Sequence, residues 1–480
     1  MDHFNYIDGE LHVDGIRARD IVAKYGSPVY VYSARTLVHH YLALKEAFSA
    51  ISPMICFSVK SCSNLSILKL LSSQGSAFDV VSGGEIYRAV KAGVAAEKIV
   101  FAGVGKSTDE LRGAVEAGVF LFNVESEAEL ERLDAVATAA GKRVKAAIRV
   151  NPDVADAGTN AKTSTGGRQT KFGVPIMRAD ALYAPRSCHS VDVVGIHIHL
   201  GSPIPDTDTY LRAIDKVEQM VDRLESAGCT IEFINIGGGF PARYSGKQCN
   251  SLADIGKAIG DRLQGLKRRG KHFIVEPGRA ISANAGILLT TVEYMKNGWD
   301  RRIAIVDAGM NTLVRPTLYG ASHVIWPTES PGFSGHWSEL GEAYEASGLD
   351  AIDVVGPICE TGDYFALGRP MPAIESASVL AIFSCGAYGM SMASQYNSRV
   401  RPAEVLVDGR TARLVRARER EEDLIAHELC GLEGTEECVA VYAGTGESGY
   451  RRYNPGPHRD RLESMGGRPA MIADGKDYLQ

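Results

Sequence analysis

The chain has 480 residues, of which 45% are hydrophobic and 23% are charged, a balance typical of a globular protein. This length exceeds one ordinary domain and predicts roughly two or three. The formal net charge of −6 argues against a nucleic-acid or anionic-membrane partner, because each of these requires a basic surface.

The sequence also lacks the signals of export. The first residues, MDHFNYIDGE, have neither the basic start nor the apolar run of a signal peptide. No uninterrupted apolar stretch reaches the roughly 18 residues of a membrane-spanning helix. The nine cysteines are scattered and odd in number, unlike a secreted disulfide framework. We expect a cytoplasmic enzyme with reduced thiols and no membrane partner.

Eight short apolar runs, separated by stretches with helical spacing, lie in the first 285 residues. Continuous apolar runs are typical of parallel strands that helices cover on both faces. Eight such units predict an α/β fold, a (β/α)8 barrel over residues 31–285. A doubly wound open sheet is the alternative, since short runs do not fix closure. The runs are 54–59, 78–81, 98–102, 119–124, 144–150, 193–200, 231–236 and 272–276.

After about residue 285 the pattern changes to apolar runs with loops and few helical stretches. This predicts a second, mainly β domain, which we expect to comprise residues 286–428 together with 1–30. Residues 429–480 are polar and rich in Gly and Arg, which predicts a loosely ordered tail. The runs of the second domain are 287–295, 302–307, 352–355, 377–383 and 404–407.

Polar and glycine residues follow the predicted barrel strands, at the end where barrel enzymes carry their active sites. Six separate segments of the chain therefore meet at one rim. The residues, from the first, second, fifth, sixth, seventh and eighth strands, are Lys60, Asp79, Arg149, His199, Gly237–Gly239 and Glu276.

Each of these residues has an ordinary and a functional interpretation. Most lysines are solvated, but burial of Lys60 behind an apolar strand would lower its pKa and free its amine to form an imine. Gly237–Gly239 is either a tight turn or a set of backbone amides that binds a phosphate. Glu276 either pairs with Arg279 or keeps a pyridine nitrogen protonated, which makes the ring an electron sink.

Two further patterns are weaker. His197 and His199 form an H-I-H run that we interpret as pointing to opposite faces of a strand, so that at most one faces the site. A zinc pair is thereby disfavoured, and we predict no metal site. Cys359 and Glu360 lie in GPICETGD between two predicted strands. Most cysteines are packing residues, which is the ordinary interpretation here.

Six segments, taken in order, resemble the fold-type III decarboxylases that use pyridoxal 5'-phosphate (PLP), and most closely the diaminopimelate branch. The likeness extends from about residue 6 to about 428. Three features favour that branch: AISANAG after EPGR, the run VDAGMNTLVRPTLYGASH, and a Glu after Cys359. The chain departs from the family pattern at Asn160, Pro203 and Thr312. The six segments are FSVK, HIHLGS, NIGGGFP, EPGRA, GPICETGD and YNSRVRPAEVLVDG.

The resemblance implies a PLP enzyme that converts meso-2,6-diaminopimelate to L-lysine and CO2, in lysine biosynthesis. Lys60 would bind the cofactor, and Cys359 would donate a proton. Members of the family are homodimers, so Cys359 and Glu360 would reach the active site of the partner subunit. The cofactor contacts would be Lys60, Asp79, Arg149, His199, Ser202, Gly238, Gly239, Glu276, Gly278, Arg279 and Tyr388. The substrate contacts would be Arg279, Arg315, Tyr319, Glu360 and Tyr388.

Three alternatives stay open. The nearest is a decarboxylase of the same fold that acts on ornithine, lysine, arginine or a carboxylated polyamine, although the charged Arg315 disfavours it. A racemase with a related barrel would not be expected to carry the CETGD segment. A non-catalytic PLP carrier would typically be a single short barrel.

Overall fold

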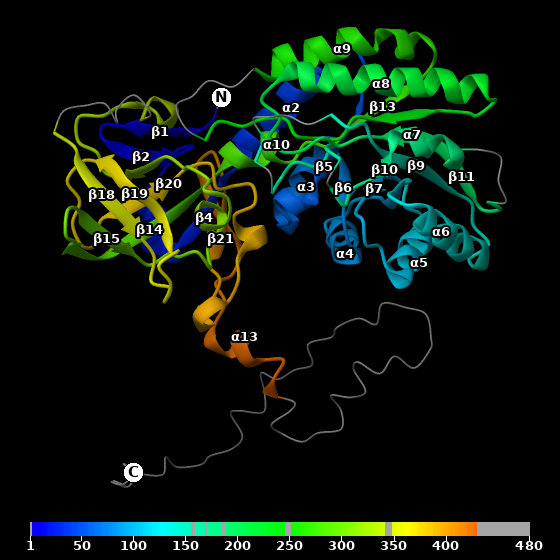
Figure 1. Cartoon of the computed structure of the whole chain (residues 1–480). Coiled ribbons are helices and arrows are strands. Elements are labelled where there is room, and N and C mark those ends of the chain that lie inside the picture. Colours follow the sequence, from blue (N-terminus) through cyan, green and yellow to red (C-terminus); the bar gives the residue numbers. More distant parts are fainter. Residues whose placement is uncertain are drawn as a thin grey trace. The chain divides into compact units, whose positions relative to one another are not determined.

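The computed structural model describes residues 2–154, 159–160, 162–168, 170–183, 188–244, 251–340 and 348–429. Residues up to Leu424 belong to one unit of the structure. In Figure 1, helices and strands in blue to green form one group, while strands in yellow and orange lie with dark-blue strands from the N-terminal part. The predicted tail lies outside the described residues beyond Leu429.

Eight parallel strands close into a barrel. Each strand pairs with the next along the chain, β8 pairs with β9, and β13 pairs again with β5. This closure confirms the predicted (β/α)8 barrel and excludes the open doubly wound sheet. The strands are β5 (Met54–Ser58), β6 (Ala77–Val80), β7 (Ile99–Phe101), β8 (Leu121–Val124), β9 (Val144–Asn151), β11 (Val191–His197), β12 (Phe233–Asn235) and β13 (His272–Val275), with the short β10 (Val174–Pro175) beside β9.

Helices alternate with these strands. Seven of them begin at a residue whose side chain accepts a hydrogen bond from the first turn, and each such cap contributes about 1 kcal/mol. The capping residues are Ser33, Asn64, Ser82, Ser107, Ser126, Asp206 and Ser251. The helices are α2 (Ala34–Ala47), α3 (Leu65–Ser73), α4 (Gly83–Lys91), α5 (Thr108–Ala117), α6 (Glu127–Ala139), α7 (Ile176–Ala179), α8 (Thr207–Ser226), α9 (Leu252–Arg268) and α10 (Arg279–Ser282).

The interior of the barrel has an apolar layer followed by a polar one. Because side chains alternate along a strand, residues two positions apart point to the same interior. The apolar layer is a buried cluster of Cys56, Ala77, Val100, Leu121, Ala147 and Ile274. Two positions later the chain carries Ser58, Asp79, Ala102, Asn123, Arg149 and Glu276. The alternation therefore places a layer of mainly polar side chains at the C-terminal ends of the strands, next to the apolar layer.

The remaining strands form the mainly β part, as predicted. A sheet has the order β19-β18-β15-β14-β4-β21-β22, and β20 joins β14 to β16. Its strands are β4 (Val29–Ser33), β14 (Gly286–Asn297), β15 (Arg302–Val306), β16 (Ile325–Pro327), β18 (Asp350–Val355), β19 (Tyr364–Met371), β20 (Val379–Ile382), β21 (Ala403–Asp408) and β22 (Thr411–Arg416). The helices here are α1 (Ala18–Tyr25), α11 (Arg315–Tyr319) and α13 (Glu421–Ile425).

The N-terminal residues contribute to this part in two places. β1 (Phe4–Ile7), β2 (Glu10–Val13), β3 (Ile16–Arg17) and β17 (Gly335–His336) form a small antiparallel sheet. β4 lies between β14, to which it is antiparallel, and β21, to which it is parallel. The contribution of the N-terminal segment thus ends at Ser33, three residues beyond the expected division.

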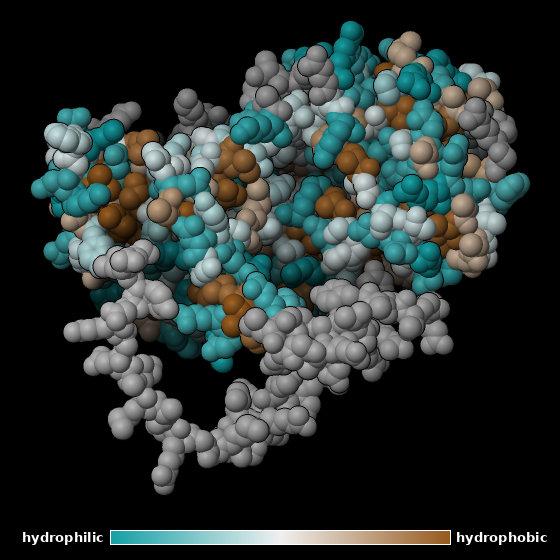
Figure 2. All heavy atoms as spheres, turned by 60° about the horizontal axis from the view of Figure 1, so that its bottom comes forward, coloured by the Kyte–Doolittle hydropathy of each residue, from teal (hydrophilic) through white to brown (hydrophobic). Residues whose placement is uncertain are grey.

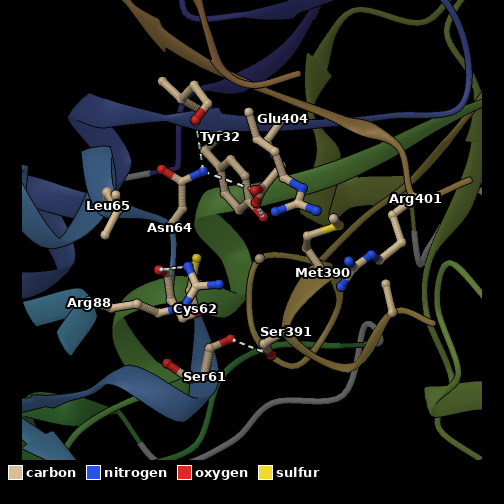
Figure 3. A pocket seen from close by; sticks show the side chains of 15 residues that line it. Tyr32, Ser61, Cys62, Asn64, Leu65, Arg88, Met390, Ser391, Arg401 and Glu404 are labelled. Carbon is tan, nitrogen blue, oxygen red and sulfur yellow. Dashed lines mark hydrogen bonds between the residues drawn. The ribbon is translucent and has the colours of Figure 1, made fainter. Parts of the chain in front are cut away.

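A polar cavity lies between the segment after β5 and the strands of the mainly β part (Figure 3). Glu404, on β21, is buried and accepts hydrogen bonds from Tyr32 Oη at 2.7 Å and Asn64 Nδ2 at 2.9 Å. The carbonyl oxygen of Ser61 accepts from the backbone N–H of Tyr388 at 2.8 Å. These contacts fix the segment that directly follows Lys60 and hold the backbone of Tyr388 against it.

The face seen in Figure 2 carries apolar residues in separate patches among hydrophilic ones. No helix in the described ranges is long and apolar enough to cross a membrane.

Candidate active site

A cavity of about 540 Å³ opens at the C-terminal ends of the barrel strands. Its walls come from most of the strands and from the loops that follow them. Lys60, Arg149, His199 and Glu276, which the sequence predicted at this rim, all line it. The rule that places barrel sites at the strand ends therefore holds for this chain.

Lys60 forms an ion pair inside this cavity. Its Nζ donates to Asp79 Oδ2 at 2.8 Å, and the same oxygen accepts from Ser58 Oγ at 2.8 Å. Burial alone would lower the pKa of Lys60, but the charge and hydrogen bond of Asp79, together with Tyr388 and Glu276, outweigh it and raise that pKa above its usual value. The expectation of a lowered pKa is therefore wrong, because the sequence did not reveal that Asp79 faces the amine across two strands.

Glu276 is held as a carboxylate on the floor of the cavity. Its Oε1 accepts from Asn123 Nδ2 at 3.0 Å and Asn235 Nδ2 at 2.6 Å, and its Oε2 lies 3.3 Å from His197 Nε2. Burial alone would raise the pKa of Glu276, but nearby His197 and Lys60 lower it below its usual value. The alternative pairing of Glu276 with Arg279 is not formed, since no ion pair of the described residues joins them.

His197 and His199 both line the cavity, so the expectation that at most one faces the site is wrong. Residues two positions apart on an extended chain share a face, which the H-I-H interpretation overlooked. Nδ1 of His199 accepts from the backbone N–H of Gly238 at 3.1 Å, so this nitrogen carries no proton. Burial and the nearby Arg149 lower the pKa of His199 well below its usual range, and the ring is neutral.

The glycine run after β12 passes close to its neighbours. Gly237 has a φ of 69°, in the left-handed region that favours glycine. A Cβ on Gly238 would clash with the carbonyl oxygen of Glu276. The turn therefore requires glycine, and it can present backbone N–H groups to an anion without steric hindrance.

Arg149 has a hydrogen-bonding capacity that the protein leaves unused. Its Nη1 donates to Glu125 Oε1 at 2.8 Å, and its guanidinium lies 4.5 Å from the centre of the Phe172 ring. Its Nη2 is buried and has no hydrogen-bond partner among the described residues. An unsatisfied buried donor of this kind is costly unless a ligand oxygen accepts from it.

A second cavity, of about 280 Å³, contains the predicted substrate contacts Arg279, Arg315, Tyr319 and Tyr388. Ser202 lies here as well, and its Oγ accepts from Arg279 Nε at 3.1 Å. The Arg279 guanidinium also lies 5.1 Å from the centre of the Tyr388 ring. The backbone N–H of Tyr388 donates to the carbonyl oxygen of Ser61, so this residue links the second cavity to the segment that carries Lys60.

Two of the departures from the family pattern lie in this second cavity, and one does not. Asn160 and Pro203 line it, and Asn160 Nδ2 donates to the carbonyl oxygen of Tyr319 at 3.2 Å. Thr312 is buried elsewhere, and its carbonyl oxygen accepts from Tyr30 Oη at 2.8 Å.

Cys359 and Glu360 are not brought to either cavity of their own chain. Both are exposed, and the backbone N–H of Cys359 donates to Asn397 Oδ1 at 2.8 Å. The structure therefore places these two expected functional residues on an exposed loop, away from the lining of both cavities of the same chain.

Several residues that hold the site were missed in the sequence. Asn123 and Asn235 fix Glu276, and Glu125 fixes Arg149. The asparagines had a signal, since each interrupts an otherwise apolar strand at its C-terminal end, in FNV and FIN. Glu125 gave no signal in the sequence, because its pairing with Arg149 depends on how neighbouring strands pack.

The residues of the first cavity fit an aldehyde-bearing aromatic cofactor with an anionic group, such as PLP. Lys60 offers a primary amine, and the ionised Glu276 offers a partner for a ring nitrogen. The unsatisfied Nη2 of Arg149 and the amides of the glycine turn can donate to oxygen atoms. No group of three or more His, Cys, Asp and Glu side chains in the described part of the chain could hold a metal ion.

The comparisons with known proteins agree with this site. A family model described as the pyridoxal binding domain of pyridoxal-dependent decarboxylases matches residues 34–283. A diaminopimelate decarboxylase of Pseudomonas fluorescens is 42% identical over 431 residues, which are 89% of this chain and 99% of that protein.

Solved structures are similar over the same extent. Diaminopimelate decarboxylase of Helicobacter pylori, complexed with L-lysine, is 37% identical with a TM-score of 0.79, covering 86% of this chain and 99% of that one. The enzyme of M. jannaschii, also in complex with L-lysine, is 34% identical with a TM-score of 0.81, covering 88% and 97%. The chain therefore belongs to the pyridoxal-dependent decarboxylases and, within them, to the diaminopimelate decarboxylase family.

Proposed function

We propose that the chain is a cytoplasmic PLP enzyme that decarboxylates meso-2,6-diaminopimelate to L-lysine and CO2. The observation that carries this proposal is the second cavity, where two buried arginines lie next to the lysine-bearing cavity. An amino acid with one reacting carboxylate needs a single anion site. A second, strongly cationic site suits a substrate with a second carboxylate at its far end.

The cofactor would be held by residues of the first cavity, by the glycine turn and by residues that border the second cavity. Lys60 would bind its aldehyde carbon, and Glu276 would pair with the ring nitrogen. His199 would lie against the ring, while the Gly237–Gly239 turn, Ser202 and the Gly278–Arg279 segment would bind the phosphate. When bound, PLP supplies an electron sink for the electron pair that remains at the substrate Cα when CO2 departs.

The protein groups orient the substrate around that centre. Arg279, Arg315 and Tyr319 would bind the far carboxylate, and Tyr388 would contact the substrate between the two cavities. A substrate without this carboxylate would leave the guanidinium groups poorly paired, so it would be rejected. The two guanidinium groups would therefore make the proposed enzyme selective for substrates with a second carboxylate.

A proton must replace the departing carboxylate at Cα. We assign its donor as Cys359, and the partner of the far ammonium as Glu360. Since neither faces its own cavities, we infer a homodimer in which each subunit supplies both residues to its partner. The exposure of the loop that carries them supports this arrangement.

The proposal is tested by CO2 release from the PLP-loaded enzyme across a panel of amino acids. The panel contains meso-diaminopimelate, ornithine, lysine, arginine and a carboxylated polyamine. Release from meso-diaminopimelate should exceed the others. A preference for ornithine or lysine would contradict the proposal and favour the related branch of the fold.

Replacing Arg315 by alanine should reduce kcat/KM on meso-diaminopimelate by about ten- to a hundredfold, the worth of a charged hydrogen bond of roughly 1.5–3 kcal/mol. Amino acids that lack a second carboxylate should be affected far less. Arg315→Lys should recover only part of the loss, because lysine cannot form two parallel bonds to a carboxylate. Arg112→Ala, on the exposed face of α5, is the matched control. An equal loss on all substrates would assign Arg315 a structural role.

Replacing Asp79 by asparagine should change the pH dependence of cofactor attachment. Asp79 raises the pKa of Lys60, so its removal lowers that pKa and leaves more neutral amine at a given pH. The rise of the attachment rate with pH should then shift to lower pH by about 1–3 units. Stopped-flow absorbance of the cofactor-free protein mixed with PLP measures it, with Asp109→Asn as an exposed control. An unchanged profile would show that Asp79 does not control the amine.

A further inference from the structure

Two arginines in the second cavity are buried without a countercharge. The exposed fraction is 7% for Arg279 and 6% for Arg315. Among the described residues, neither guanidinium takes part in an ion pair, and their polar contacts are with Ser202, Tyr244 and His323. Uncompensated buried charges are costly, so neutral neighbours must hold them in place until an anion arrives.

His323 is one of these neighbours, and its contacts define its protonation. It is fully buried, and its Nδ1 lies 2.8 Å from the carbonyl oxygen of Phe383, which can only accept. Its Nε2 lies 2.8 Å from Nη1 of Arg315, which can only donate. The proton is therefore on Nδ1 and the ring is neutral. Consistently, burial and the charge of Arg315 lower the pKa of His323 to about 3.

Tyr244 is the other neighbour, and it contacts both arginines. Its Oη accepts from Arg279 Nη1 at 2.8 Å. The centre of its ring lies 4.4 Å from the Arg315 guanidinium carbon and 5.5 Å from that of Arg279. An aromatic face attracts a cation without neutralising it. The His323 ring meets the Tyr244 ring at 89°, with 5.3 Å between their centres.

One short segment of backbone holds both neighbours. The carbonyl oxygen of Phe383 accepts from His323, and the hydroxyl of the next residue, Ser384, donates to the carbonyl oxygen of Arg243 at 2.9 Å. Arg243 directly precedes Tyr244, and its backbone N–H donates to Asn284 Oδ1 at 3.1 Å. The backbone at Phe383 and Ser384 thus helps to place both the His323 imidazole and the segment that carries Tyr244, through contacts that do not involve the arginines.

We propose that Tyr244 and His323 are positioning residues that hold Arg279 and Arg315 ready for the substrate's far carboxylate. This inference rests on the proposed function and extends it to the residues that set specificity. A guanidinium that is already fixed loses less conformational freedom when it binds a carboxylate, and its fork is presented in one orientation. Neither residue need touch the substrate for this effect.

The test compares two ligands that differ in one carboxylate. L-lysine keeps the far carboxylate of meso-diaminopimelate, and cadaverine is L-lysine without it. The dissociation constants of both for the PLP-loaded enzyme are measured by calorimetry. His323→Leu removes both hydrogen bonds of the imidazole, and it should reduce the preference for L-lysine over cadaverine by about ten- to a hundredfold. His323→Gln keeps one donor and one acceptor and should restore much of the preference.

Tyr244→Phe provides an independent arm, which also applies if His323→Leu does not fold. It keeps the aromatic ring and removes only the oxygen that accepts from Arg279. The preference for L-lysine should again fall, while cadaverine binding stays near that of the wild type. His40→Gln is the matched control, because His40 also lies near a backbone carbonyl and a side chain, at 3.0 Å from Ile281 O and 2.6 Å from Asp2 Oδ1, outside both cavities.

Equal weakening of both ligands in the two variants would overturn the proposal, since it would indicate general damage to the site. A wild-type enzyme that binds L-lysine and cadaverine equally would overturn it too. Failure of the proposed function is a separate result: the wild type would release no CO2 from meso-diaminopimelate, whereas the ratio of the two dissociation constants can still be measured.

Discussion

Replacing Lys60 by alanine should abolish turnover and remove the visible absorbance of the bound cofactor. Lys60 offers its amine to the first cavity, where Asp79 is the one side chain among the described residues that accepts a hydrogen bond from it. The buried Lys106 is an unsuitable substitute, because its Nζ already donates to Gly103 O, Asn123 O and Glu129 Oε1 at 2.6–2.8 Å. No other group is therefore expected to take over.

Borohydride reduction of the wild-type enzyme, followed by peptide mapping, identifies the attachment site directly. The pyridoxyl group should be recovered on the peptide that contains Lys60, and the Lys60→Ala protein should carry none. Lys91→Ala, on the exposed end of α4, serves as the control and should keep both absorbance and activity. Recovery of the label on a different lysine would refute the assignment.

Mixing two inactive variants should restore activity if subunits share their sites. Lys60→Ala damages the barrel cavity, whereas Cys359→Ala damages the loop proposed to serve the partner. After joint unfolding and refolding, about half of the dimers are mixed, and each mixed dimer has one doubly damaged and one intact site. Activity should therefore recover to about a quarter of the wild-type value.

The design separates the shared arrangement from its alternative. If Cys359 served its own barrel, each site of a mixed dimer would carry one lesion and no activity would return. Two different affinity tags, purified in series, establish that mixed dimers have formed before activity is read. Mixing Lys60→Ala with itself under the same conditions gives the background.

The barrel was predictable because its strands are apolar on both faces. Each of the eight predicted runs contains or overlaps a strand, from β5 to β13. In the larger β sheet, β4, β16, β19 and β22 match none of the predicted runs, and β19 and β22 are the two edges of that sheet. Most of the side chains of β22 are exposed or half-buried, so its sequence TARLVR has no continuous apolar run. Strand detection from hydrophobicity fails where only one side of a strand is covered.

The first cavity was largely predictable for a related reason, since the C-terminal ends of parallel strands converge whatever the loops do. The ionisation of Lys60 was not predictable, because it depends on which side chain of the next strand lies opposite its amine. Tyr244 and His323 had no signal at all. They belong to segments far apart in the sequence, and only the folded backbone at Phe383 and Ser384 places them together.

The position of β4 also constrains the order in which the chain can fold during synthesis. The barrel has all its strands once Val275 has left the ribosome, and domains generally fold as units as they emerge. β4 emerges before all of them, yet one of its neighbours, β21, is made near the end of the described chain. Until then β4 has an unpaired edge, to which other strands can add. A nascent chain that stalls after the barrel is complete should therefore hold its N-terminal strand accessible to proteases and chaperones.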